Sequence, residues 1–195
     1  MQELEPLKRQ LAAWDGKSKQ SITAIYTHFH NHHGFVDALC QSFKDEELHK
    51  SASWLLKHLL EQDFKHFKRQ HKHLKYSKED IEMLFQQQSV SLENRQTIFS
   101  QLKNLQHWQT KLHLLQSLPY LLIIDEYKDG LAQFLRLSLI DQNKFVRAWA
   151  YHGFYLLSCE YPQFKEEAEQ FLKMGLRDEP ASVKARIRNI TKDHN

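Results

Sequence analysis

Glycine and proline are scarce in this chain: its 195 residues include five glycines and four prolines. Turn-rich β architectures depend on both residues, so the scarcity favours helices joined by short connections. Long apolar runs are also missing, because the longest, residues 118–124, is far below the roughly 20 residues that cross a bilayer. We therefore predict an all-α protein without a transmembrane segment.

Cysteine is nearly absent too, with only Cys40 and Cys159 in the chain. The two are far apart and belong to no CxxC pair, which excludes a zinc ribbon or a dithiol redox motif. Lone cysteines are typical of a reducing compartment, where they act as small core residues. We predict that both are core residues and that the protein is cytoplasmic.

Local catalytic motifs are missing as well. The sequence contains no glycine-rich phosphate loop, no GxSxG elbow and no HExxH helix. These absences favour a non-enzymatic protein, and we expect no cofactor.

A repeat of 37 residues is the strongest positive feature. Residues 125–148 align without a gap on residues 162–185, with eight identities in 24 positions. Such a period predicts helical units that bury their apolar faces by stacking on their neighbours. The identical pairs are Lys128/Lys165, Gln133/Gln170, Phe134/Phe171, Leu135/Leu172, Leu139/Leu176, Asp141/Asp178, Val146/Val183 and Ala148/Ala185.

Each repeat is predicted to form two helices, because its apolar residues recur at helical spacing on either side of Asp141 or Asp178. Weaker copies of the pair lie at residues 97–118 and 35–60, and residues 18–30 are predicted to form a further, N-terminal helix. An insertion around residues 64–88 separates the two weaker copies and is predicted to carry its own helix or two.

This pattern resembles the HEAT repeat: an apolar helix is followed by an Asp at the turn, and Val-Arg/Lys-Ala then opens a second helix. The resemblance implies one domain over residues 1–195: a short right-handed α-solenoid of about four to five helix pairs whose second helices line the concave face. It also implies a ladder between adjacent repeats, formed by Asp141 and Asp178 with Arg147 and Lys184. In the copy at residues 97–118, Asn104 stands in place of the Asp and Thr110 stands near the basic position, so we do not expect a ladder through the middle of the chain.

A basic segment at residues 64–78 has six Lys or Arg, three His and no acidic residue. On a helix, Phe64, Phe67, His71 and Leu74 share one face and the cations gather on the adjoining face: Lys65, Lys68, Arg69, Lys72 and Lys75. This arrangement suits the phosphate backbone of a nucleic acid, an anionic membrane surface or an acidic partner. It also suits an ordinary solvated helix face, and the mild net charge of +3 does not decide among these.

Four histidines cluster at His28, His30, His32 and His33. If the helix continued through them, His28 and His32 would lie one turn apart, as zinc ligands do, but no third or fourth ligand is evident. HEAT-like deoxyhypusine hydroxylases hold iron with His-Glu pairs, and this sequence has none. We therefore predict no metal site, and a metal-assisted enzyme centred on this cluster is the weakest alternative.

The chain has four tryptophans, and HEAT-like alkylpurine DNA glycosylases use Trp and Asp on a basic concave face. No carboxylate stands at helical spacing from Trp108 or Trp149 in the manner of that family, so core packing explains these rings better. We predict an interaction module that binds a protein or peptide on the second-helix face through Trp108, Lys111, Trp149 and His152. The alternative is a nucleic-acid-binding protein that uses the basic segment, with a glycosylase-like activity if it is an enzyme.

Overall fold

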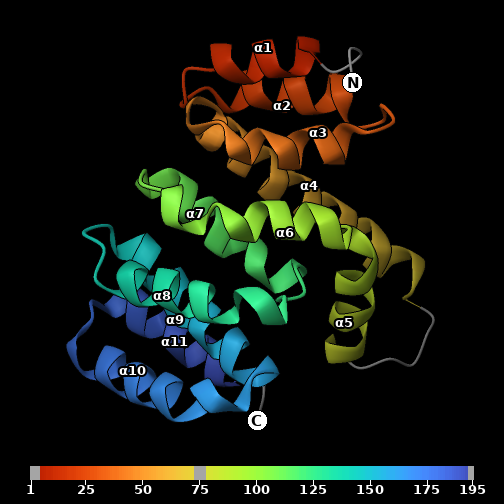
Figure 1. Ribbon diagram of the computed structural model, residues 1–195. Helices are drawn as coiled ribbons and strands as arrows, with labels where there is room; N and C mark the ends of the chain where they lie inside the picture. The colour runs from red at the N-terminus through yellow and green to blue at the C-terminus, as the bar shows by residue number, and fades with distance from the viewer. Residues whose placement is uncertain (1–4, 73–77, 193–195) are drawn as a thin grey trace. The chain divides into compact units, whose positions relative to one another are not determined.

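The computed structural model describes residues 5–72 and 78–192, and within these ranges it is all-helical (Figure 1). The predicted all-α class is confirmed. The chain divides into two compact units, Met1–Leu122 and Ile123–Asn195, and each is described here by itself. One repeat domain over residues 1–195 stays a prediction.

The first unit contains seven α-helices in its described residues: α1 (Glu5–Ala13), α2 (Lys19–Phe29), α3 (Phe35–Gln41), α4 (His49–Gln70), α5 (Lys78–Ser89), α6 (Leu92–Ser100) and α7 (Trp108–Ser117). Short 3-10 turns join several of them: η2 (Ser42–Lys44), η3 (Glu46–Leu48), η4 (Leu102–Asn104) and η5 (Leu118–Tyr120). The helix predicted at residues 18–30 is present as α2, and the pairs predicted at residues 35–60 and 97–118 are present as α3 with α4 and as α6 with α7.

Local sequence explains the helix boundaries. The hydroxyl of Ser18 accepts a hydrogen bond from the Ser21 amide and caps α2, and Ser91 caps α6 through the Asn94 amide. Gly34 separates α2 from α3 with a φ of 76°, a left-handed conformation that glycine adopts without strain. Pro119 lies in η5, directly after α7 ends.

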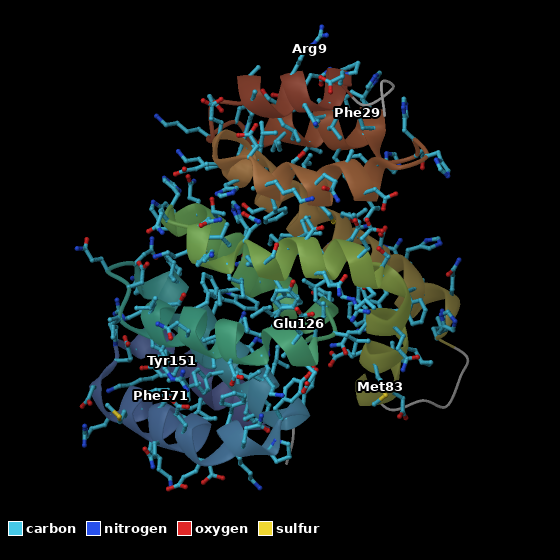
Figure 2. All side chains as sticks on the ribbon, in the orientation of Figure 1. Arg9, Phe29, Met83, Glu126, Tyr151 and Phe171 are labelled. Carbon is cyan, nitrogen blue, oxygen red and sulfur yellow. The ribbon has the colours of Figure 1, made fainter. Side chains whose placement is uncertain are left out.

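Helix α4 is the spine of the first unit and packs against α7 and against α1, α2 and α3. Its buried positions include Leu55, Leu56, Leu59 and Leu60, while Phe29 from α2 fills the same unit's core (Figure 2). Beyond Leu60 no residue of α4 is fully buried. The last third of α4 therefore leaves the core while remaining part of one helix.

The second unit contains four α-helices in its described residues: α8 (Lys128–Leu139), α9 (Lys144–Glu160), α10 (Lys165–Asp178) and α11 (Ala181–Lys192). The short turns η6 (Asp125–Tyr127) and η7 (Pro162–Phe164) precede α8 and α10. Each pair of equivalent elements begins 37 residues apart: η6 and η7, α8 and α10, α9 and α11. The two helix pairs predicted from the repeat are confirmed.

Helix α9 is central in the second unit, since α8, α10 and α11 all pack against it (Figure 1). Phe154 of α9 meets Phe171 of α10 edge to face, with ring centroids 4.9 Å apart. Tyr151, also on α9, is buried beside α10, and Figure 2 labels both Tyr151 and Phe171. Aromatic side chains thus fill the space between the repeated helix pairs.

Among the described residues, no helix combines the length and the apolar character that a membrane span requires.

Candidate functional site

The basic segment does not begin a new helix. Residues 64–70 form the last turns of α4, His71 ends the helix, and Lys72 follows in the turn. Lys65, Lys68 and Arg69 lie on one face of α4, because residues three and four apart are neighbours on a helix surface. Together with Lys72 they form what we name the basic stripe; Lys75 lies outside the described residues.

All four side chains of the basic stripe are exposed. None of them forms an ion pair with a carboxylate of the described residues, and the nearby Glu61 is held by Lys57 at 3.0 Å. The Nζ of Lys68 lies 5.4 Å from the centroid of the Phe64 ring. The stripe therefore keeps its positive charge in solvent, where an external anion can reach it.

An aromatic cluster holds the basic end of α4 in place. The ring centroids of Phe64 and Phe67 lie 5.1 Å and 5.5 Å from that of Phe85 on α5, and Phe64 also lies 5.3 Å from Tyr120. Phe85 is buried, whereas Met83 on the same helix is exposed (Figure 2). Polar contacts reinforce the joint, because Gln86 Nε2 donates to the Pro119 carbonyl at 2.8 Å.

Phe85 and Tyr120 were not singled out from the sequence. They reach Phe64 from helix α5 and turn η5, which are distant along the chain, so no local spacing could have identified them. Their contacts support the basic stripe and pack against the Phe64 and Phe67 rings, which are half-buried.

Two of the predicted partner-binding residues lie on the first turn of α7. Trp108 is 41% exposed, and Lys111, one turn further along, is half-buried. The imidazole of His107 stacks beside Trp108, with ring centroids 6.0 Å apart. The structure thus brings these two residues together on one surface of the first unit.

The other two lie on α9 in the second unit, and both are half-buried. The guanidinium carbon of Arg186 is 3.4 Å from the centroid of the Trp149 ring, a close cation–π contact with α11. The His152 ring centroid is 5.5 Å from that of Trp149. Arg186 therefore covers one face of the indole that was predicted to contact a partner.

Arg147 and Lys184, two basic residues of the second unit, form contacts within that unit. Arg147 forms a bidentate pair with Glu179, at 2.8 Å and 2.9 Å, and also donates to the Asp141 carbonyl. Lys184 donates to the Arg177 carbonyl at 2.8 Å. In both repeats the basic residue in the first turn of the second helix thus donates to a carbonyl at, or just beyond, the end of the first helix.

The resemblance predicts a ladder formed by Asp141 and Asp178 with Arg147 and Lys184. Asp178 pairs with its neighbour Arg177 at 2.7 Å, and Asp141 accepts a hydrogen bond from the Asn143 amide. The contact from one repeat to the next is made by Arg147 with Glu179, the residue after Asp178. Glu179 is thus the acid in this contact, in place of the two aspartates that the resemblance predicts.

The four histidines of the cluster do not lie on one helix. Helix α2 ends at Phe29, and the His28 and His32 rings lie 5.8 Å apart, tilted, with both side chains exposed. The Nδ1 atom of His30 lies 3.1 Å from the Tyr26 carbonyl. Within residues 5–72 and 78–192, no group of three or more His, Cys, Asp or Glu side chains is arranged to hold a metal ion.

The two cysteines occupy different environments. Cys40 is buried as predicted, and desolvation raises the pKa of its thiol to about 12. Cys159 is exposed, so its prediction as a core residue is wrong, although partial burial of its sulfur still raises the pKa of the thiol. Neither environment favours the thiolate that a nucleophilic cysteine requires.

Comparisons with protein-family models, with curated proteins and with solved structures found no match to this chain.

Proposed function

We propose that this protein is a non-enzymatic binding protein whose first unit binds the phosphate backbone of nucleic acid through the basic stripe. One observation carries the proposal. Lys65, Lys68, Arg69 and Lys72 are all exposed on one supported helix end, and none pairs with a carboxylate of the described residues.

Counterion release is the physical basis. A nucleic acid holds a condensed layer of cations, and each Lys or Arg that neutralises a phosphate releases part of that layer. The basic stripe can contribute about four such contacts over about 10 Å of helix axis, at 1.5 Å per residue. Because the neighbouring phenylalanine rings are packed against Phe85 and Tyr120, we expect binding that reads phosphates and not bases.

A charge-reversal experiment with a matched control tests the proposal. Fluorescence anisotropy of a labelled 20-base-pair duplex would be measured for the wild type and for the triple variant Lys65→Glu, Lys68→Glu, Lys72→Glu. The control changes three exposed lysines of the second unit to Glu, namely Lys144, Lys165 and Lys173, and so alters the net charge equally. We expect at least a tenfold weaker affinity for the first variant and a small change for the control.

Equal loss of affinity in both variants would show that only the total charge of the protein matters, and it would contradict the proposal. The absence of wild-type binding at 50 mM salt would do the same. Circular dichroism of both variants checks that the helices persist, as expected for exposed positions.

A peptide or protein partner is the second candidate function. It is supported by the exposed indole of Trp108 beside Lys111 on α7, since exposed Trp is enriched at binding hot spots. A displayed peptide library would be selected on the wild type and counter-selected on Trp108→Ala. Peptides that bind both proteins equally well would exclude this surface.

We also propose that the repeated helix pairs are HEAT-like and belong to a right-handed α-solenoid in the cytoplasm. The 37-residue spacing of η6 and η7, of α8 and α10, and of α9 and α11 supports the repeat. An experimental structure in which successive pairs do not stack in the same sense would contradict the solenoid. Cell fractionation tests the location.

A further inference from the structure

A cleft of about 760 Å³ lies within the first unit, where the ends of three helical segments meet. Its walls come from the end of α1 and the following loop, from η3 and the first turn of α4, and from the start of α7. Small-molecule sites commonly have volumes of about 300–1,000 Å³. The cleft is therefore large enough for a small ligand or for one side chain of a peptide.

The charged residues that line this cleft are three acids, Asp15, Glu46 and Glu47, and one cation, Lys50. Glu46 and Glu47 are exposed, and neither forms an ion pair with any described residue. Burial and the nearby Lys50 lower the pKa of His107, which disfavours a positive charge on that ring. The cleft consequently carries negative charge.

Two lining residues add features that suit a nitrogen cation. The indole of Trp14 presents an aromatic surface, while its Nε1 is already used in a 2.8 Å hydrogen bond to the Ser18 carbonyl. Thr110 is fully buried at the start of α7, and its Oγ1 has no hydrogen-bond partner among the described residues. A buried hydroxyl without a partner is unfavourable, so a donor that reached it would be favoured.

The remaining polar groups of the cleft are occupied. His49 Nε2 lies 2.9 Å from the Phe43 carbonyl, Ser51 Oγ donates to the Leu48 carbonyl, and His107 Nδ1 accepts the Gln109 amide. Thr110 is thus the buried polar side chain of the cleft that is left to meet a ligand.

We propose that this cleft binds an organic cation, an ammonium or guanidinium group, between the Glu46 and Glu47 carboxylates, the Trp14 ring and the Thr110 hydroxyl. Carboxylates attract the charge, an aromatic face favours a cation by a cation–π contact, and the hydroxyl accepts an N–H. The group can belong to a free amine or to a basic side chain of a peptide, since both present the same chemistry.

Calorimetric titrations separate the two sources. The probes are agmatine, a capped Ala-Arg-Ala tripeptide, and the same tripeptide with neutral citrulline in place of arginine. We expect agmatine or the arginine peptide to bind and the citrulline peptide to bind at least tenfold more weakly. The tighter of the two cationic probes identifies the source. Failure of both cationic probes at millimolar concentration, or equal binding of citrulline, would overturn the proposal.

Four variants test the assigned residues. We expect the double variant Glu46→Gln, Glu47→Gln to weaken binding roughly five- to tenfold, and Lys50→Met to strengthen it by removing an opposing charge. Thr110→Val should weaken binding while leaving the free protein at least as stable, because its hydroxyl has no partner among the described residues. The control Glu126→Gln, Glu169→Gln removes two exposed carboxylates of the second unit and should change nothing. Binding that survives the Glu46 and Glu47 changes, or that falls equally in the control, would contradict the site.

Discussion

The Arg147 guanidinium and the Glu179 carboxylate form a bidentate pair that links the first turn of α9 to the residue following α10. Their side chains are only 19% and 10% exposed, and Tyr151 adds a longer hydrogen bond of 3.4 Å to the same carboxylate. This contact joins the two repeats of the second unit, so its removal should loosen their packing.

The Arg147–Glu179 pair should contribute more to stability than the more exposed bidentate pair Arg136–Glu167, whose side chains are 42% and 31% exposed. Solvent screens an exposed pair to about 0–1 kcal/mol, whereas loss of a partner from a partly buried pair leaves a charge without compensation. Double-mutant cycles with alanine, read by urea unfolding, should give a coupling of about 1–2 kcal/mol for Arg147–Glu179 and less than about 0.5 kcal/mol for Arg136–Glu167. Equal couplings would show that burial does not distinguish the two pairs.

Gly175 is predicted to tolerate no side chain. A Cβ built there would lie 2.6 Å from Ile187 and 2.7 Å from the Tyr151 ring, which places α10 tightly against α9 and α11. Gly175→Ala should therefore destabilise the protein by about 1–3 kcal/mol, the usual effect of overpacking. The measurement is the free energy of unfolding in urea.

Gly130 provides the matched control because it lies in helix α8 with nothing within 4 Å of a built Cβ. Gly130→Ala should stabilise the protein by about 0.5–1 kcal/mol, as alanine is the better helix former. If the two substitutions shift stability in the same direction, the close approach at Gly175 is wrong.

His113 should make stability depend on pH. Burial, together with Lys57 and His107, lowers its pKa from 6.5 to about 4 in the folded protein, and its Nδ1 lies 3.2 Å from Ser53 Oγ. The unfolded chain then binds the proton more readily between pH 6.5 and 4, so stability should fall as the pH falls through this window. The slope contributed is at most about 1.4 kcal/mol per pH unit.

The variant His113→Asn can keep a hydrogen-bond donor near Ser53 but cannot titrate. Urea unfolding of both proteins between pH 7 and pH 4 measures the difference in slope, which excludes contributions from all other groups. We expect a shallower slope for the variant; parallel curves would show that His113 titrates normally.

The helical elements were accessible from sequence because short-range periodicity determines them. The 37-residue repeat predicts the helix pairs α8–α9 and α10–α11, and the helix predicted from Ser18 onward is α2. The sequence predicts residues 64–88 to carry their own helix or two, and α5 lies there, but residues 64–70 belong to α4. Phe64 and Phe67 continue the apolar spacing of Leu56 and Leu60, and this continuity extends α4 to Gln70.

The contacts between elements were not accessible in the same way. Glu179 directly follows Asp178, the residue predicted for the ladder. At the end of a helix, neighbouring residues point their side chains in different directions. The cleft beside Thr110 needs three segments from different parts of the first unit, and no spacing in the sequence connects them. Long-range packing decides such features, whereas a sequence pattern reports mainly local preference.

The salt dependence of duplex binding tests the central proposal most directly. Anisotropy titrations between 50 mM and 200 mM salt give the slope of log K against log salt, which is about −0.9 for each phosphate contact. Four contacts from the basic stripe predict a slope of about −3.6, and Arg69→Gln alone should reduce its magnitude by about 0.9. A slope near zero, or one that Arg69→Gln leaves unchanged, would contradict nucleic-acid binding at this helix.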